Sequence, residues 1–363
     1  MSSLIKQCSV RSLKAPLNQP FRVATGQHNT LDNLLFALEL SDGTKGWGEA
    51  AVATHITGET VPATRKNLEH IARDLIGKEA GEYLKISEGL HEQFPRNQAA
   101  VAAVETALMD ALTRQWNIPL WRFFGNKPQK FQTDITVVIG SLEETEQSVS
   151  AYYRRGFRTF KVKIGRDYDL DLKRVQAVHR LSHGARIILD ANQGFSAEGI
   201  LRFLKELAQS KIRPVLLEQP VPQNDWAGLK KITRSTTIPV CADESASSLK
   251  DVIQIIKTKA VKAINIKLMK TGLFHAHKIA ILAQANNIKL MIGGMMESSL
   301  AMTASAHLAA GVGGFDFVDL DTPFFIKKGY ERNPCLNSSG IYDLSNVPKG
   351  IGIIPSGKMI SKR

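Results

Sequence analysis

The segment Thr159-Phe-Lys-Val-Lys-Ile-Gly165 is a short apolar run that carries two lysines two positions apart. Similar runs follow at intervals of roughly 25 residues, which is about the length of one strand and one helix in a (β/α)₈ barrel. The next runs end in a charged residue at Asp190, Glu218, Asp243 and Lys267. The pattern therefore predicts parallel strands whose reactive side chains meet at one end of a barrel.

Eight strands are expected from residue 133 onward, because apolar runs there alternate with amphipathic helices. We place the strands at 133–138, 158–164, 187–190, 215–219, 240–243, 263–267, 289–292 and 315–319. Helices are expected between them at 143–154, 168–181, 197–209, 249–258, 272–285 and 300–310. Eight such strands close a barrel.

The first 125 residues do not follow this period. Strand patterns at 8–13, 34–40 and around Gly46-Trp-Gly-Glu49 predict an antiparallel meander, with a loop at 16–28 that contains proline and glycine. Helical periodicity then occupies 64–75, 85–91 and 97–115.

We therefore predict an α/β fold in three parts. Residues 1–125 form an α+β capping domain and residues 126–322 form a TIM-type (β/α)₈ barrel. Residues 323–363 form a C-terminal segment that packs back on the cap.

Composition excludes several classes of protein. The chain has 363 residues, 43% hydrophobic and 22% charged, so it can bury a large core and is not disordered. It shows no signal-peptide pattern and no run of about 18 apolar residues. Its cysteines, Cys8, Cys241 and Cys335, form no Cys-x-x-Cys pair. We expect a soluble, cytoplasmic protein with no membrane partner.

The formal net charge of +13 raises the question of a nucleic-acid partner, because a basic surface attracts phosphates. The basic residues are dispersed along the helices, however, and no helix-turn-helix, RNA-binding or zinc-finger pattern occurs. We therefore expect no specific nucleic acid, and the charge favours small anionic ligands.

Three acids end neighbouring strands of the predicted barrel: Asp190, Glu218 and Asp243. Carboxylates that converge on one point form a hard oxygen site, which suits Mg²⁺ or Mn²⁺ better than zinc. The alternative is that each acid caps the next helix or pairs with a surface lysine. That alternative explains one acid better than it explains three at consecutive strand ends.

Lys161 and Lys163 point to the same face of their strand, which in a barrel is the interior. Buried lysines are costly, so a role is expected for them. We expect the neighbouring ammonium group and a divalent cation to lower the pKa of one lysine, making it a base near neutral pH. Lys267 would approach from the opposite side. The alternative is that these lysines only neutralise the carboxylates as ion pairs.

Two bases on opposite faces of a carbon beside a metal-bound carboxylate predict proton abstraction and return. One base removes the α-proton, the cation stabilises the enediolate, and the other base returns a proton on the opposite face. A single base with a leaving group would use the same site, so racemisation, cycloisomerisation and dehydration all remain open.

The chain resembles the enolase superfamily, in which lysine bases act with Mg²⁺, because five motifs match that superfamily in order and spacing. They are Lys161-Val-Lys163, Asp190-Ala-Asn192, Glu218-Gln-Pro220, Asp243-Glu-Ser245 and Asn265-Ile-Lys-Leu-Met-Lys270. Within the superfamily the chain is most similar to the muconate-lactonizing subgroup, and there to the dipeptide epimerases. The resemblance covers nearly the whole chain.

The resemblance implies a role for each motif. Lys163 and Lys267 would be the two acid/base catalysts, and Lys161 would bind the substrate carboxylate. Asp190, Glu218 and Asp243 would hold Mg²⁺. Asn192 and Glu244 would lie around these ligands and orient them.

Further residues would contact the substrate. Asp319-Leu-Asp321 matches the family's Asp-x-Asp, which holds the α-ammonium group of a dipeptide. Thr136, Gly294 and Met296 match positions that contact the dipeptide backbone. The implied reaction is epimerisation at the α-carbon of the C-terminal residue.

The resemblance leaves the substrate side chains undecided. The loops at 16–28 and 53–59 resemble the family's specificity loops, with Thr57 and Glu59 as candidate contacts. Arg22 directly follows Pro20-Phe21, which departs from the arginine spacing of members that act on Ala-Glu.

Two alternative functions remain open. One is another enzyme of the subgroup, an N-acylamino acid racemase or an o-succinylbenzoate synthase. The other is a non-catalytic barrel that binds a ligand or nucleic acid. A homo-oligomer is expected for any of these functions.

Overall fold

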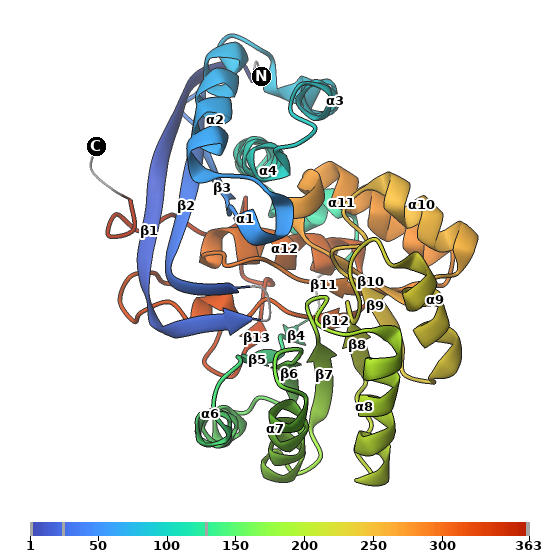
Figure 1. Ribbon diagram of the computed structural model, residues 1–363. Helices are drawn as coiled ribbons and strands as arrows, with labels where there is room; N and C mark the ends of the chain where they lie inside the picture. Colours follow the sequence, from blue (N-terminus) through green and yellow to red (C-terminus); the bar gives the residue numbers. More distant parts are fainter. Residues whose placement is uncertain (1–2, 24–25, 128–129, 361–363) are drawn as a thin grey trace.

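The computed structural model describes residues 3–23, 26–127 and 130–360. It has a three-stranded antiparallel sheet with helices at the N-terminal end of the chain, and a curled sheet of eight parallel strands beside it (Figure 1). The sequence prediction of an α/β barrel preceded by an α+β cap is confirmed.

The cap consists of one sheet and the helices packed on it. Its strands are β1 (Ile5–Val23), β2 (Gly26–Leu40) and β3 (Lys45–Ala50), in the order β1-β2-β3. Its helices are α1 (Thr54–Thr57), α2 (Val61–Leu75), η1 (Ala80–Glu82), α3 (Tyr83–Gln93) and α4 (Gln98–Gln115), and α5 (Leu120–Phe124) follows. The three longer helices of the cap lie where the helical periodicity predicts them.

The prediction of a loop at residues 16–28 is wrong. Strand β1 continues through this segment and pairs with β2 as a long hairpin, with a register shift between Pro16 and Phe21. The two prolines of the segment are tolerated because β1 is an edge strand, so a missing N–H breaks no second ladder. Residues 24–25 at the tip lie outside the described residues.

Eight parallel strands form the curled sheet, in the sequential order β12 to β5. They are β5 (Ile135–Val137), β6 (Thr159–Lys163), β7 (Arg186–Asp190), β8 (Leu216–Glu218), β9 (Val240–Ala242), β10 (Ala263–Ile266), β11 (Lys289–Ile292) and β12 (Phe315–Val318). Each lies within a predicted strand or one residue from it. The eight-strand prediction is therefore confirmed.

The sheet closes without a continuous ladder. Among the described residues β5 and β12 share no ladder pairing, but the Asp134 amide donates to the Val318 carbonyl at 2.8 Å. The Leu320 amide also donates to Thr133 Oγ1 at 2.7 Å. The first and last strands of the sheet, β5 and β12, therefore meet through isolated hydrogen bonds, and we call this junction the seam.

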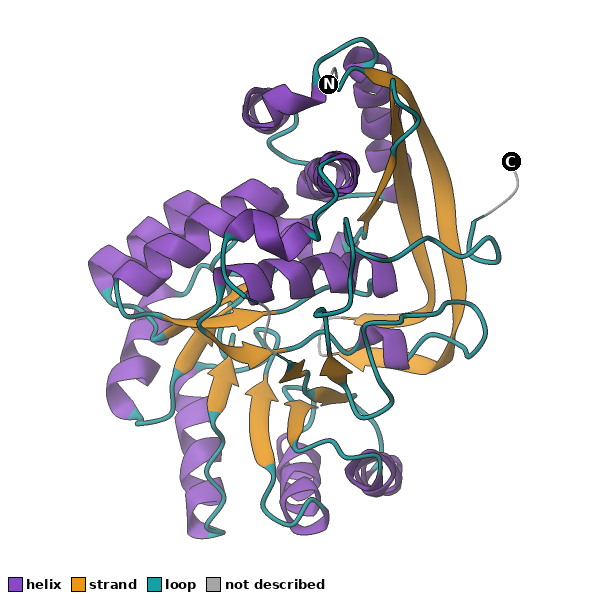
Figure 2. Cartoon of the chain, turned by 180° about the vertical axis from the view of Figure 1, so that it is seen from behind, coloured by secondary structure: helices purple, strands orange, loops and turns teal. Residues whose placement is uncertain are grey.

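Helices cover the outside of the curled sheet (Figure 2). They are α6 (Leu142–Arg154), α7 (Tyr168–Leu181), α8 (Ala197–Gln209), α9 (Trp226–Ser235), α10 (Leu249–Thr258), α11 (Leu268–Ala285) and α12 (Ser299–Val312). Helix α9 was not among the predicted helices. Helix α11 begins four residues earlier than predicted and is interrupted at Gly272, whose φ of 71° breaks the helical run.

The C-terminal segment contacts both parts of the fold. After η2 (Thr322–Phe324), strand β13 (Ile341–Tyr342) pairs antiparallel with β4 (Phe131–Gln132). Isolated bridges join Ile360 to Leu13 and Gly350 to Pro119. None of the described helices is long and apolar enough to cross a membrane.

His307 joins the C-terminal segment to α12 from inside the core. The Trp121 amide donates to its Nδ1 at 3.0 Å, so its Nε2–H faces the Ile351 carbonyl at 3.0 Å. Burial lowers the pKa of His307 to about 4, and the imidazole is therefore neutral at pH 7.

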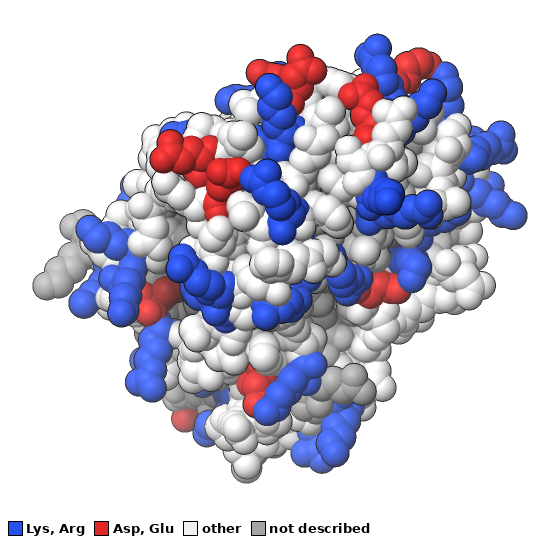
Figure 3. All heavy atoms as spheres, turned by 90° about the horizontal axis from the view of Figure 1, so that it is seen from below, with Lys and Arg blue, Asp and Glu red and all other residues white. Residues whose placement is uncertain are grey.

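Figure 3 shows lysine and arginine side chains scattered over one face, with acidic side chains between several of them.

The cap sheet and α4 approach each other so closely that only glycine fits at the contact. A Cβ on Gly48 would overlap the Ala103 carbonyl oxygen of α4. We expect Gly48→Ala to lower the free energy of unfolding by about 1–3 kcal/mol, because the backbones must separate. Urea unfolding followed by tryptophan fluorescence measures the change.

Gly89 provides the matched control. It lies on the exposed side of α3, and an added Cβ would meet nothing within 4 Å. Gly89→Ala should therefore raise stability by about 0.5–1 kcal/mol. Equal effects of the two substitutions would contradict the close packing of α4 on the sheet.

Candidate active site

A pocket lies at the carboxyl ends of the barrel strands, where cap and barrel meet. From the barrel it is lined by Thr136, Lys161, Lys163, Asn192, Lys267, Gly294, Met295, Met296, Asp319, Asp321 and Thr322. From the cap it is lined by Phe21, His28, Ala53 and Ile56. Nine of the predicted site residues therefore share one pocket.

The predicted metal ligands lie beneath this pocket, on neighbouring strands. In the sheet register Lys163 is beside Asp190, and Asp190 is beside Glu218. Asp243 follows directly after β9. All three carboxyl groups are buried, and Asn265 Nδ2 holds Glu218 with a hydrogen bond of 2.7 Å to Oε1.

Lys161 is the centre of the charge network. Its Nζ lies 3.0 Å from Asp190 Oδ2, 2.8 Å from Glu218 Oε2 and 2.6 Å from Asp319 Oδ2. One ammonium group thus joins two predicted metal ligands to the predicted ammonium-binding acid, which lies across the barrel seam.

The other two pocket lysines each contact a different acid. Lys163 Nζ donates to Asp190 at 2.6 Å and to Asn192 Oδ1 at 3.1 Å. Lys267 Nζ donates to Asp243 Oδ2 at 2.6 Å. Lys270, beneath Lys267, donates to Asp243 Oδ1 at 2.7 Å and to the Asn265 carbonyl at 2.9 Å.

The lowered pKa expected for Lys161 or Lys163 beside a divalent cation stays a prediction, whereas the acids of the site by themselves raise the pKa of Lys161 and Lys267. Burial lowers the pKa of Lys161, but Asp190, Asp319 and Glu218 raise it by more than burial lowers it. The resulting pKa is well above the usual value of lysine. Lys267 likewise has a raised pKa, because Asp243 outweighs burial and the charge of Lys161.

The acids around Glu218 have the chemistry of a divalent-cation site. Asp190, Glu218 and Asp243 offer only carboxylate oxygens, which Mg²⁺ prefers. Glu244 is 4% exposed, yet neither of its carboxylate oxygens has a hydrogen-bond partner among the described residues. Burial, followed by the charges of Asp243 and Asp190, raises the pKa of Glu244 to about 7. A cation beside these acids would relieve that repulsion.

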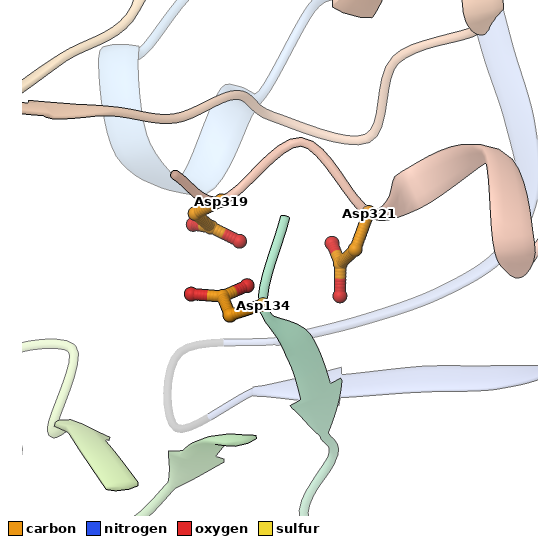
Figure 4. A group of neighbouring side chains, drawn as sticks. All are labelled: Asp134, Asp319 and Asp321. Atoms are coloured by element: carbon orange, nitrogen blue, oxygen red, sulfur yellow. The ribbon is translucent and has the colours of Figure 1, made fainter. Parts of the chain in front are cut away.

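A second group of acids lies at the barrel seam. Asp134, Asp319 and Asp321 each place one carboxylate oxygen so that all three lie within 4.8 Å of one another (Figure 4). The Thr136 amide donates to Asp321 Oδ2 at 2.6 Å. Both carboxylate oxygens of Asp134 are buried without a hydrogen-bond partner among the described residues. Burial, then Asp319 and Asp321, raises the pKa of Asp134 well above its usual value.

Buried acids outnumber buried bases around the pocket. Seven carboxyl groups, on Asp134, Asp190, Glu218, Asp243, Glu244, Asp319 and Asp321, lie near four lysines, Lys161, Lys163, Lys267 and Lys270. When all are ionised, three negative charges are left over. Uncompensated buried charge is unfavourable, so this arrangement favours cationic ligands at both acid groups.

The cap side of the pocket is apolar except at His28. Phe21, Ala53 and Ile56 line it, and Met295 and Met296 face them from the loop after β11. The cap also holds this loop directly, since Asn33 Nδ2 donates to the Met296 carbonyl at 2.8 Å. The Ser298 amide donates to Glu49 at 3.0 Å.

The candidate contacts predicted in the cap loops lie elsewhere. Arg22 bonds Gln27 and lies 3.6 Å from Glu144, outside the pocket lining. Glu59 is buried and accepts from the Ala99 amide at the start of α4. Thr57 donates to the Ala53 carbonyl within its own short helix.

Several lining residues were not predicted. Phe21, Ala53 and Ile56 gave no chemical signal, because apolar residues are common in any loop. Asp134, which was also not predicted, lies at the seam and not in the pocket lining; it did carry a signal, since it lies two positions before Thr136 and an acid within an apolar strand is rare.

Fold and site together define a barrel whose strand ends bear acids and lysines under an N-terminal cap. The family model "Mandelate racemase / muconate lactonizing enzyme, N-terminal domain" matches residues 6–125. The model "Enolase C-terminal domain-like" matches residues 144–357. The chain belongs to the enolase superfamily, in the mandelate racemase and muconate lactonizing enzyme family.

Relatives within the family are similar over their full lengths. The hydrophobic dipeptide epimerase of Citrifermentans bemidjiense is 48% identical, across 98% of this chain and 99% of its own. The aromatic dipeptide epimerase of Herpetosiphon aurantiacus is 40% identical, across 96% and 98%. The solved dipeptide epimerase of Enterococcus faecalis V583, complexed with Mg and the dipeptide L-Leu-L-Tyr, has a TM-score of 0.89 at 30% identity and covers both chains fully.

Thermal stability can show which of the two acid groups binds Mg²⁺, the strand-end acids that include Asp243 or the seam acids that include Asp134. A ligand that binds only the folded state stabilises it by about 2.7 kcal/mol at 100 times its dissociation constant. We expect Mg²⁺ to raise the thermal midpoint of the wild type and of Asp134→Asn, but not that of Asp243→Asn. Differential scanning fluorimetry with and without Mg²⁺ measures this.

Asp134→Asn is the matched control, because it also removes one buried acid. Asp190→Asn should behave as Asp243→Asn does. A Mg²⁺ shift that survives in Asp243→Asn and disappears in Asp134→Asn would place the metal at the seam acids.

Proposed function

We propose that this chain is a Mg²⁺-dependent dipeptide epimerase that inverts the α-carbon of the C-terminal residue. The observation that carries the proposal is the placement of Lys163 and Lys267. They come from the ends of β6 and β10, four strands apart in the sheet order, and line the same pocket. A carbon held between them can lose a proton to one lysine and gain one from the other.

Asp190, Glu218 and Asp243 would hold the Mg²⁺, with Asn192 and Glu244 beside them. When bound, the ion stabilises the negative charge that develops on the substrate carboxylate as the α-proton leaves. Mn²⁺ has the same preference for oxygen ligands and would substitute. The solved Enterococcus relative, complexed with Mg and a dipeptide, supports this assignment.

Each catalytic lysine must give up its proton before it can act as a base. Lys163 is held by Asp190, and Lys267 is held by Asp243. A carboxylate that held the cation would have less charge left for the ammonium beside it, which would ease transfer of the lysine proton. Lys161, which contacts Asp190 and Glu218, remains charged and would bind the substrate carboxylate.

The seam acids would bind the α-ammonium group of the dipeptide. Asp319 and Asp321 line the pocket, whereas Asp134 lies behind them and is not part of the lining. Charged hydrogen bonds between an ammonium and carboxylate oxygens are about 2.7–2.9 Å long, so one nitrogen can bridge oxygens up to 4.8 Å apart. Thr136, Gly294 and Met296 would contact the peptide backbone.

The side chains of the substrate would be hydrophobic. The cap side of the pocket presents Phe21, Ala53 and Ile56 opposite two methionines, and no described arginine lines it. An acidic substrate side chain would be desolvated there with no described lysine or arginine of the cap to pair with, only His28, which is unfavourable. The hydrophobic and aromatic dipeptide epimerases among the relatives support the same preference.

The proposal includes three further features of the protein that follow from its sequence. They are the division of the chain at residues 125 and 322, a cytoplasmic location and a homo-oligomeric state.

A library of dipeptides incubated in D₂O with Mg²⁺ tests the activity and its specificity. We expect α-deuterium in the C-terminal residue of dipeptides with hydrophobic side chains, at rates at least tenfold above Ala-Glu, measured by mass spectrometry. Absence of exchange across the library would exclude the epimerase. Exchange of N-succinylamino acids that survives Asp321→Ala would instead favour an N-acylamino acid racemase, because such substrates offer no ammonium to Asp321.

The two lysines should serve opposite faces of the substrate. We expect Lys163→Ala to slow α-proton exchange from one epimer and Lys267→Ala to slow it from the other. Each loss should be about 10²–10⁴-fold. Exchange into separately supplied L,L and L,D dipeptides, followed by NMR at early times, measures this. Equal losses for both epimers in both variants would contradict the two-base mechanism.

A further inference from the structure

Arg174 is a fully buried arginine that the proposed reaction does not use. It lies on α7 with 0% of its surface exposed, and it is the bulkiest of the fully buried side chains. Burying a guanidinium group is costly unless its donors are satisfied. Its partners therefore indicate what it does.

All five N–H groups of Arg174 have acceptors. Nε donates to Thr145 Oγ1 on α6 at 3.0 Å. Nη1 donates to the Lys163 carbonyl at 2.8 Å and to Asp171 Oδ1 at 2.9 Å. Nη2 donates to the Val138 carbonyl at 2.6 Å and to the Val137 carbonyl at 3.4 Å. The planar guanidinium thus joins the carboxyl ends of β5 and β6.

Asp171 extends this contact to the turn after β6. Its Oδ1 accepts from Arg174, and its Oδ2 accepts from the Gly165 amide at 2.7 Å and the Arg166 amide at 3.3 Å. The backbone at Lys163 is therefore held at its own carbonyl by Arg174. Two residues further on it is held at its amides by Asp171.

The contact serves one side of the pocket. Lys163 and Thr136, which precedes Val137, both line the pocket directly above these carbonyls. Lys267 is held differently, because its carbonyl accepts from the Lys270 amide in the first turn of α11. The described contacts of Arg174 include no residue on the Lys267 side.

We propose that the Arg174–Asp171 pair is a positioning device that aligns Lys163 for proton transfer at one face of the substrate. The inference rests on the proposed two-base function. Displacement of a reacting group by about 1 Å can cost 100-fold in rate, so a device that fixes the strand end matters for catalysis. A purely structural role would affect both faces of the substrate equally.

Arg174→Lys tests the inference, because lysine keeps the charge but cannot reach five acceptors from one nitrogen. We expect α-proton exchange of the epimer that depends on Lys163 to fall about 10- to 100-fold in kcat, with little change in KM. Exchange of the epimer that depends on Lys267 should fall less than about threefold. The patterns of Lys163→Ala and Lys267→Ala define which epimer is which.

Arg180→Lys is the matched control. Arg180 lies on the same helix and also contacts α6, through Glu146 at 2.6 Å, but its side chain is 67% exposed. The control should leave both exchange rates unchanged. Circular dichroism and thermal melting establish that each variant is folded.

Thr145→Val is the second variant should Arg174→Lys fail to fold. It removes the acceptor of Nε, together with the hydrogen bond of 2.9 Å that Thr145 Oγ1 donates to the Ser141 carbonyl at the start of α6. It should reduce the Lys163-dependent exchange selectively, about three- to tenfold. Equal losses for both epimers in a folded variant would overturn the positioning role and leave the epimerase intact. Absence of exchange in the wild type would instead overturn the proposed function.

Discussion

Most of the site depends on the burial of opposite charges at one end of the barrel. Lys161 contacts Asp190, Glu218 and Asp319, and so joins β6, β7, β8 and the seam after β12 through a single ammonium group. Neither sign could be buried at this density without the other. The excess of acid over base favours cationic ligands at the site, and the carboxylates raise the pKa of Lys161 and of Lys267.

The cap completes the pocket and is fixed to the barrel at the loop after β11. Asn33 and Glu49 of the cap sheet bond the Met296 carbonyl and the Ser298 amide, so the apolar wall from the cap and the methionines of the barrel are held in one arrangement. In the proposed function the barrel would carry the chemistry, and the junction with the cap would select the substrate side chains. This division explains how one arrangement of acids and lysines can serve substrates that differ only in their side chains.

Particular residues show how far the sequence leads. Asp190, Glu218 and Lys267 could be placed because each ends a short apolar run, and the strand period then brings their side chains to one edge. The hairpin at 16–28 could not, because its prolines indicate a loop unless the strand is known to lie at a sheet edge. Asp134 and Arg174 were missed because their importance depends on residues that are remote in the sequence. Asp134 lies close to Asp319 and Asp321 across the seam, and Arg174 donates to the carbonyl of Val137, 37 positions earlier.

The sequence by itself determined the fold class, the order of the strands and the identity of the acids and lysines, since these follow from local periodicity and residue type. Only the tertiary structure decided which charges touch. That contact set the sign of the pKa changes at Lys161 and Lys267, because the electrostatic balance depends on distances between strands remote in the chain. It also decided that Phe21, Ala53 and Ile56 of the cap face Met295 and Met296 of the barrel, because these two parts of the chain meet only when the protein is folded.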